Sequence, residues 1–180
     1  MDNDKCKKYL KEYKKNDYYD KISILISEWA NGGDLLDYLR NKYTILKLKE
    51  WRIILFQIIS TLVVIQTKYP NFRHNDMKAN NLLVYNLGIT DSTKYFIYNI
   101  NGKKYIVPNI GIQIKLWDFD FACIGDSIEN DKVNSKWANN INISKEKNQY
   151  YDIHYFFNTL TRKGFLPDFF INPNINTSLK

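Results

Sequence analysis

The sequence predicts an α+β domain that is mainly helical and carries one β-hairpin. The stretch 47–69 is a long helical signal that ends at Pro70. Two strand-like runs, 95–98 and 103–107, lie on either side of Asn101-Gly102, which is a strong two-residue turn signal. A chain of 180 residues is long enough for one domain around one core.

The first elements are short. Residues 1–20 form a charged, Tyr-rich lead-in that is poor in aliphatic side chains. The apolar run 21–29 predicts a strand, which Asn31-Gly32-Gly33 interrupts. Asp34 is then placed to cap a helix that ends at about residue 41.

The predicted helix 47–69 is apolar almost all round. Between Ile53 and Ile65, only Gln57, Ser60 and Thr61 are polar. This run is shorter than the ~20 residues that a membrane span needs, so we expect burial in a protein core.

The remaining segments follow in order. Polar groups at 74, 76, 78 and 81 do not follow helical spacing, so 71–84 predicts a loop that enters a strand. The segment 122–147 is polar and rich in Asn, and 150–160 predicts an amphipathic helix that begins near Asp152. We expect His154 of this helix to face the core, and we expect a further apolar cluster at 165–170.

Composition excludes several classes of function. A hydrophobic content of 44% with 16% aromatics indicates a globular protein. The net charge of +7 is spread thinly, which predicts neither a nucleic-acid partner nor a membrane partner. Cys6 and Cys123 lack metal-ligand spacing, and the charged first residues do not form a signal peptide, so we expect an intracellular, cytoplasmic location.

The loop 74–81 carries the chemistry. It reads His-Asn-Asp-Met-Lys-Ala-Asn-Asn, and this matches H-x-D-x-K-x-x-N, the catalytic loop of protein kinases. Downstream, Trp117-Asp118-Phe119-Asp120 resembles the magnesium-binding D-F-G segment, and upstream 24–39 resembles a kinase hinge with the helix that follows it. The chain therefore resembles eukaryotic-type serine/threonine protein kinases over about 22–160. The residues at 117–120 and 150–157 are similar to those of kinases of large DNA viruses, a resemblance that implies a location in the host cell or the virion.

The resemblance implies a set of catalytic and metal-binding residues. Asp76 would orient the attacking hydroxyl of a protein substrate, and Lys78 would neutralise charge on the transferred phosphoryl group. Asn81 and Asp118 would hold Mg²⁺ against the phosphates of ATP. His74 would be structural.

The resemblance also implies an adenine site. The carbonyl of Glu28 and the amide of Ala30 would bind the base, and Leu83 would form the floor beneath it or serve only core packing. Asp34 would reach the ribose, although a plain helix N-cap is an equal alternative. Asp152 would brace the catalytic loop from behind.

The sequence departs from the family pattern in several places. Asn75 stands where many kinases carry an Arg that reads phosphorylation, and Asp120 replaces the Gly of D-F-G, which predicts a less permissive metal loop. The 27 residues before Glu28 contain neither G-x-G nor V-A-x-K. We therefore expect 21–180 to be a partial kinase domain that has the hinge, central helix, catalytic loop and D-F-D segment but lacks the small lobe and is truncated after the helix of Asp152.

Two classes of function remain open. The first is a truncated or split serine/threonine kinase, in which a separately encoded small lobe would be a partner and the chain alone would be inactive. The second is a non-catalytic kinase-like binding module. A nucleic-acid-binding domain and a small-molecule kinase are weaker alternatives.

Overall fold

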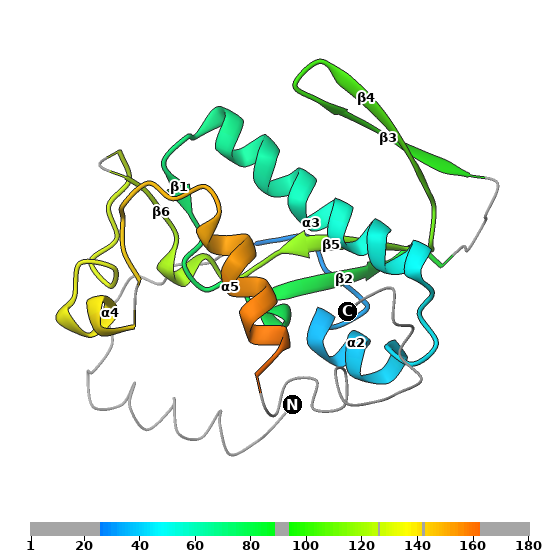
Figure 1. Ribbon diagram of the computed structural model, residues 1–180, viewed down its shortest axis with the longest axis horizontal. Coiled ribbons are helices and arrows are strands. Elements are labelled where there is room, and N and C mark those ends of the chain that lie inside the picture. Colours follow the sequence, from blue (N-terminus) through cyan, green and yellow to red (C-terminus); the bar gives the residue numbers. More distant parts are fainter. Residues whose placement is uncertain (1–25, 89–93, 126, 142, 163–180) are drawn as a thin grey trace.

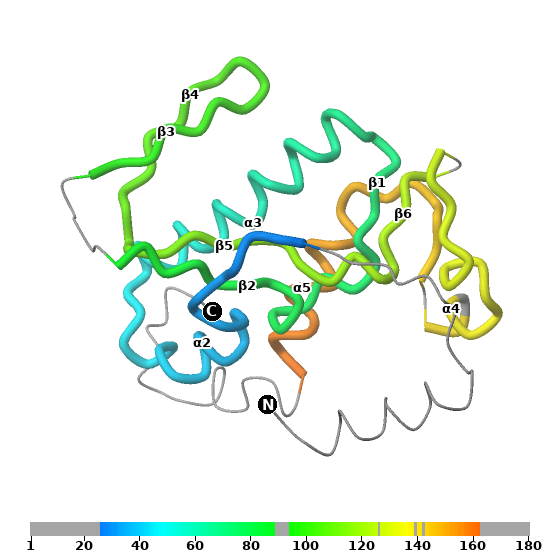
Figure 2. Tube along the Cα trace, turned by 180° about the vertical axis from the view of Figure 1, so that it is seen from behind, coloured from blue at the N-terminus to red at the C-terminus, as the bar shows by residue number. Residues whose placement is uncertain are grey.

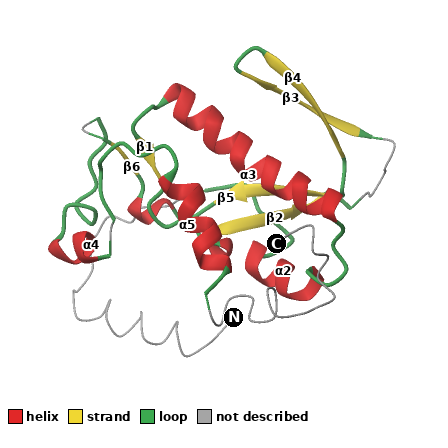
Figure 3. Cartoon of the chain, in the orientation of Figure 1, coloured by secondary structure: helices red, strands yellow, loops and turns green. Residues whose placement is uncertain are grey.

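The computed structural model describes residues 26–88, 94–125, 127–141 and 143–162. The lead-in 1–20, residues 21–25 of the expected strand, Cys6 and the cluster 165–170 lie outside this part of the chain. Within it, helices and antiparallel strand pairs are combined, which confirms the α+β class (Figure 1, Figure 3).

Helix α2 (Leu35–Lys42) begins where the sequence predicts. The side chain of Asp34 caps it, because Oδ1 accepts a hydrogen bond of 2.9 Å from the amide of Asp37. Leu35, Leu36 and Leu39 are buried on one face of the helix, so α2 joins the core through this apolar stripe.

The long helix α3 (Leu48–Lys68) confirms the predicted central helix. Trp51, Ile54, Ile58 and Leu62 are buried at three- and four-residue spacing, which is the spacing of one helix face. The opposite flank is more open than the apolar sequence predicts, since Val64 is 51% exposed. No helix in the described ranges has the length and apolar character that crossing a bilayer requires.

Strands β2 (Leu82–Asn86) and β5 (Ile112–Leu116) form an antiparallel pair at the centre of the molecule. The pair lies between α3 and α2, as Figure 1 shows. Leu82, Val84, Ile112 and Ile114 are buried there. They join one core cluster with residues of both helices, of the 74–81 loop and of α5 (Tyr151–Leu160), among them Leu35, Leu39, Ile54, Ile58, Met77, Phe156 and Leu160.

The predicted hairpin is confirmed as β3 (Tyr95–Ile100) and β4 (Lys103–Pro108). Asn101 and Gly102 form its turn, and both have positive φ, 49° and 75°. Tyr98 and Tyr105 pack against Phe56 of α3, at ring-centroid distances of 5.2 and 5.6 Å, so the hairpin rests on the central helix.

A second group of short elements surrounds the 74–81 loop. Strand β1 (Phe72–Arg73) pairs with β6 (Cys123–Ile124), and the 3₁₀ helices η1 (Ala79–Asn81) and η2 (Phe119–Phe121) precede β2 and β6. Helix α4 (Lys136–Asn140) lies in the segment 122–147. Helix α5 starts within two residues of the predicted position.

Two expectations are wrong. Residues 26–29 of the expected strand 21–29 are not in a strand, and Ile26 and Trp29 are 90% and 81% exposed. A strand needs a neighbour to accept and donate its backbone hydrogen bonds, and the described residues provide none there. His154 is exposed rather than core-facing, because the buried face of α5 is the one that carries Asp152, Phe156 and Thr159.

Candidate active site

The 74–81 loop is fixed from behind by α5. The carboxylate of Asp152 is fully buried, and its two oxygens accept hydrogen bonds from the backbone amides of His74, at 2.8 Å, and Asn75, at 2.9 Å. Burial raises the pKa of Asp152, while these two hydrogen bonds oppose the rise. The expected bracing of the loop by Asp152 is therefore present in the geometry.

Asp76 lies at the centre of a cluster of donors. Lys78 Nζ and Asn81 Nδ2 donate to Asp76 Oδ2 at 2.7 and 2.8 Å, and the same Asn81 nitrogen lies 2.9 Å from the Asp76 carbonyl. The hydroxyl of Tyr155 donates to Asp76 Oδ1 at 3.2 Å. Asp76 and Lys78 are part-buried, so this carboxylate is held in one orientation while it stays accessible.

The same loop is bound to the segment 117–120. His74 is fully buried, and its Nε2 lies 2.8 Å from the carbonyl oxygen of Trp117. The Trp117 amide donates to the carbonyl of Asn81 at 3.1 Å. His74 also packs against the ring of Phe119 at 5.2 Å. These contacts agree with a structural role for His74, and they place Asp118 immediately beside the loop.

Asp118 has a left-handed backbone, with φ of 57°, at the residue before η2. Because Asp120 replaces the Gly of D-F-G, the sequence led us to expect a restricted backbone conformation at Asp120. Asp120 is, however, not among the described residues with positive φ. The restricted conformation therefore falls on the proposed metal ligand itself. A non-Gly residue held at positive φ indicates that its surroundings fix it. Asp120 instead forms an ion pair with Lys132 at 2.5 Å.

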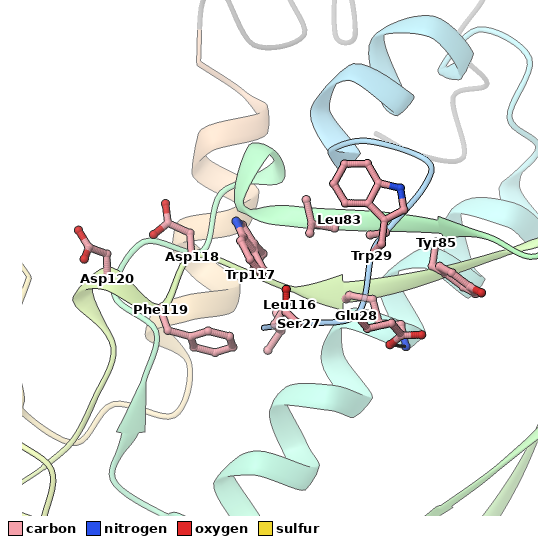
Figure 4. A pocket seen from close by; sticks show the side chains of 12 residues that line it. Ser27, Glu28, Trp29, Leu83, Tyr85, Leu116, Trp117, Asp118, Phe119 and Asp120 are labelled. Atoms are coloured by element: carbon pink, nitrogen blue, oxygen red, sulfur yellow. Dashed lines mark hydrogen bonds and ion pairs between the residues drawn. The ribbon is translucent and has the colours of Figure 1, made fainter. Parts of the chain in front are cut away.

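A cavity of about 620 Å³ opens beside Asp118. Figure 4 shows Asp118 and Asp120 at one end of it, with Trp29 and Tyr85 toward the other. Glu28, Ala30 and Leu83, which the sequence predicts for the adenine site, all line it. The other lining residues are Ser27, Lys115, Leu116, Trp117 and Phe119.

Glycine sets the position of the hinge over β2. The Gly32 amide donates to the Val84 carbonyl at 2.8 Å, and the Val84 amide donates to the Gly33 carbonyl at 2.8 Å. A Cβ on Gly32 would meet the Val84 oxygen at 2.6 Å, so no other residue fits this approach without a shift. In Figure 2 this segment crosses the β2–β5 pair.

Asp34, Asp76, Lys78 and Asn81 are not among the residues that line the cavity. Asp34 serves the N-cap of α2, which is the alternative that the sequence left open. Asp76, Lys78 and Asn81 lie together in the loop, and the loop contacts the following segment at Trp117, at the ring of Phe119 and at the Phe121 carbonyl. The two halves of the predicted site are thus adjacent, although no described hydrogen bond joins Asp118 itself to the side chains of the loop.

Oxygen donors at the site fit Mg²⁺. Both contacts of the Asn81 amide nitrogen are directed at Asp76, so the amide oxygen of Asn81 points away from that carboxylate. Asp118 contributes an exposed carboxylate. Among the described residues, no group of three or more His, Cys, Asp or Glu side chains could hold a metal. In proteins, Mg²⁺ commonly takes one or two protein oxygens and completes its shell with phosphates and water.

The segment after the metal loop is tied to the 74–81 loop without a phosphate. The buried Asn75 donates to the Phe121 carbonyl at 3.0 Å, and its Oδ1 lies 3.4 Å from the Ser144 amide. Arg73 donates to Ser144 Oγ at 2.7 Å and to the Glu146 carbonyl at 3.1 Å. Neutral and charged hydrogen bonds from two adjacent residues therefore hold both ends of this segment.

Sequence reasoning missed several of these residues. Tyr155 follows Asp152 by three positions, so helical spacing alone could have placed both on one face of α5. Lys115 pairs with Glu28 at 3.1 Å across the cavity, but no local pattern marks it. The same is true of Arg73, whose guanidinium lies 3.8 Å from the ring centre of Tyr151.

Comparison with known proteins gives a consistent result. The family model described as "Poxvirus serine/threonine protein kinase" matches residues 5–179. A protein of Acanthamoeba polyphaga mimivirus, named "Putative serine/threonine-protein kinase R400", is 51% identical over 173 residues, which are 93% of this chain and 36% of that protein.

More distant relatives carry similar names. The mimivirus protein "Putative serine/threonine-protein kinase R301" is 36% identical over 134 residues, covering 68% of this chain and 33% of its own length. "Serine/threonine-protein kinase 2" of Monkeypox virus is 36% identical over 92 residues, or 51% of this chain and 18% of that protein. The chain spans about a third of the length of the two mimivirus relatives.

Proposed function

Because the chain belongs to the poxvirus serine/threonine protein kinase family, we propose that it carries the large-lobe half of an ATP-dependent site for phosphoryl transfer to protein hydroxyls. The observation that supports this best is the arrangement of the 74–81 loop. Its carboxylate is held by Lys78, Asn81 and Tyr155, and its backbone is bound to the segment that carries Asp118 at the edge of a cavity.

In this proposal each residue has one role. Asp76 orients the substrate hydroxyl and takes its proton as the hydroxyl oxygen bonds to the γ-phosphorus and the bond to the bridging oxygen of ADP breaks. Lys78 neutralises charge on the transferred group. Asn81 and Asp118 would hold Mg²⁺ through their side-chain oxygens, and the cation would offset the negative charge of the phosphates.

The cavity takes the nucleotide base. Leu83 forms an apolar wall, and the backbone of Glu28 and Ala30 lies where it could hydrogen-bond an adenine. Asp34 caps α2 through Oδ1, which leaves its other carboxylate oxygen for a contact with the ribose. The buried free thiol of Cys123 is in keeping with an intracellular, reducing location, which we propose as well.

Phosphoryl transfer depends mainly on positioning and on charge stabilisation around the phosphates. The printed sequence contains no G-x-G and no V-A-x-K before the hinge. We therefore propose that this chain needs a small kinase lobe for activity and that it transfers no phosphate by itself. The lobe could be encoded separately or lie elsewhere in a longer protein.

The test uses a chimaera in which this chain replaces the matching 173-residue segment of mimivirus R400. Transfer of radiolabelled phosphate to a general acceptor protein is compared for the chimaera, its Asp76→Asn variant and a control, Asp37→Asn, which alters an exposed carboxylate of α2. We expect activity in the chimaera and the control, and a loss of about 10²- to 10⁴-fold in Asp76→Asn. Equal activity in all three would refute the assignment of Asp76 and favour a non-catalytic binding module.

The metal site has a separate test in the same chimaera. Binding of Mg-nucleotide is titrated by calorimetry for wild type, Asp118→Asn and Asn81→Ala. Asn81→Ala removes an oxygen ligand and Asp118→Asn removes the negative charge of the other ligand, so both should weaken Mg-nucleotide binding, whereas nucleotide binding without Mg²⁺ should change little. Equal Mg-nucleotide affinity in the three proteins would show that these residues do not bind the metal.

A further inference from the structure

The carboxylate of Asp76 has one hydrogen-bond donor from outside its own loop, the hydroxyl of Tyr155. Lys78 and Asn81 belong to the same loop as Asp76, but Tyr155 comes from α5, 79 positions away in the sequence. Its hydroxyl lies 3.2 Å from Asp76 Oδ1, while Lys78 and Asn81 both donate to Oδ2. Tyr155 therefore holds the oxygen that the loop leaves without a donor.

The lone pairs of Asp76 show why that oxygen matters. A carboxylate offers about four acceptor positions, roughly two on each oxygen. Two donors already use Oδ2, and Tyr155 uses one position on Oδ1. The remaining acceptor position lies on Oδ1, so an incoming hydroxyl would donate to the same oxygen that Tyr155 holds.

Helix α5 makes this contact rigid. Asp152 of the same helix binds the backbone amides of His74 and Asn75, and Tyr155 follows one turn later on the same face. The ring of Tyr155 stacks on that of Tyr151 at 5.9 Å with an interplanar angle of 18°. One helix thus fixes both the backbone of the loop and the side chain of Asp76.

We propose that Tyr155 is a positioning residue that orients Asp76 Oδ1 toward the substrate hydroxyl. This inference rests on the proposed function. It assigns a role in catalysis to the hydroxyl of Tyr155 and none to its ring, which serves packing. The burial of Tyr155, the negative charge of Asp76 and the hydrogen bond between these two side chains raise the pKa of Tyr155 to about 12. The hydroxyl therefore stays a donor at neutral pH.

The Tyr155→Phe variant tests the inference because it keeps the ring and removes only the donor. Steady-state kinetics of the R400 chimaera are measured for wild type, Tyr155→Phe, Asp76→Asn and Tyr98→Phe. Tyr98 is the matched control, since this tyrosine of the hairpin is also half-buried, but its ring contacts Phe56 of α3. Melting temperature and Mg-nucleotide affinity are measured for each protein.

We expect Tyr155→Phe to lower kcat by about tenfold, at the lower end of what one hydrogen bond to a charged group contributes. KM for Mg-ATP, nucleotide affinity and melting temperature should stay at the wild-type values, as should all parameters of Tyr98→Phe. Retention of wild-type kcat in Tyr155→Phe would overturn the inference, and so would a loss of kcat in parallel with nucleotide affinity and melting temperature. Full activity of Asp76→Asn would instead refute the proposed function, and the inference with it.

Discussion

Gln57 is the polar residue on which the position of the central strand pair depends. It is buried in the apolar helix α3, where its Nε2 donates to the Ile112 carbonyl at 3.2 Å and its Oε1 accepts from the Ile114 amide at 2.7 Å. These backbone groups are two residues apart on β5, so they lie on the same edge of the strand. The side-chain amide of Gln57 therefore takes the place of a neighbouring strand.

Replacing Gln57 with Leu removes both hydrogen bonds at nearly constant volume. Two buried backbone groups lose their partner, at about 1–3 kcal/mol each, and the leucine returns about 1–2 kcal/mol through apolar burial. Taking the middle of each range, we expect the free energy of unfolding to fall by about 2.5 kcal/mol. The effect should extend to function, because β5 leads directly into Trp117 and Asp118.

The assay is chemical denaturation followed by circular dichroism, with hydrogen exchange of the Ile114 amide as a local readout. Gln66→Leu is the control, since this half-buried glutamine of the same helix makes one hydrogen bond in the described part of the chain, to the carbonyl of Gln149. The control should change stability by less than about 0.5 kcal/mol. If Gln57→Leu unfolds like the control and the Ile114 amide stays protected, the reasoning is refuted.

Three further predictions follow from the site. Asp152→Asn should lower stability by about 1–3 kcal/mol in denaturant titrations, because the amide offers one oxygen to two backbone donors; unchanged stability would contradict the bracing of the loop. The active chimaera should keep its activity after phosphatase treatment, because Asn75 ties the segment 125–147 to the loop without a phosphate; inactivation by phosphatase would argue against this. The pKa of Tyr155 is raised from 10.0 to about 12 in the folded protein, so the stability linked to it is present below pH 10 and lost as the pH rises toward 12. Between pH 10 and 12, the melting temperature of Tyr155→Phe should therefore fall less than that of the wild type. An equal fall in the two proteins would contradict the raised pKa of Tyr155.

The sequence alone determined the elements whose signals are local. The apolar periodicity of 47–69 and the proline after it were enough to predict α3, because helix formation depends on neighbours three and four positions away. Asn101-Gly102 predicted the hairpin, since few residue pairs adopt positive φ at both positions. The motif at 74–81 similarly predicted a loop that enters a strand, together with the family that the comparisons show.

The tertiary structure decided what depends on contacts between distant segments. The strand expected at 21–29 had the right composition, but for residues 26–29 the described part of the chain provides no neighbouring strand that would complete their hydrogen bonds. The backbone restriction lies at Asp118 and not at Asp120, because the contacts of Trp117 with His74 and Asn81 fix the chain just before Asp118. Tyr155 reaches Asp76 only because α5 folds behind the loop, and no pattern within either segment records a hydrogen bond across 79 positions.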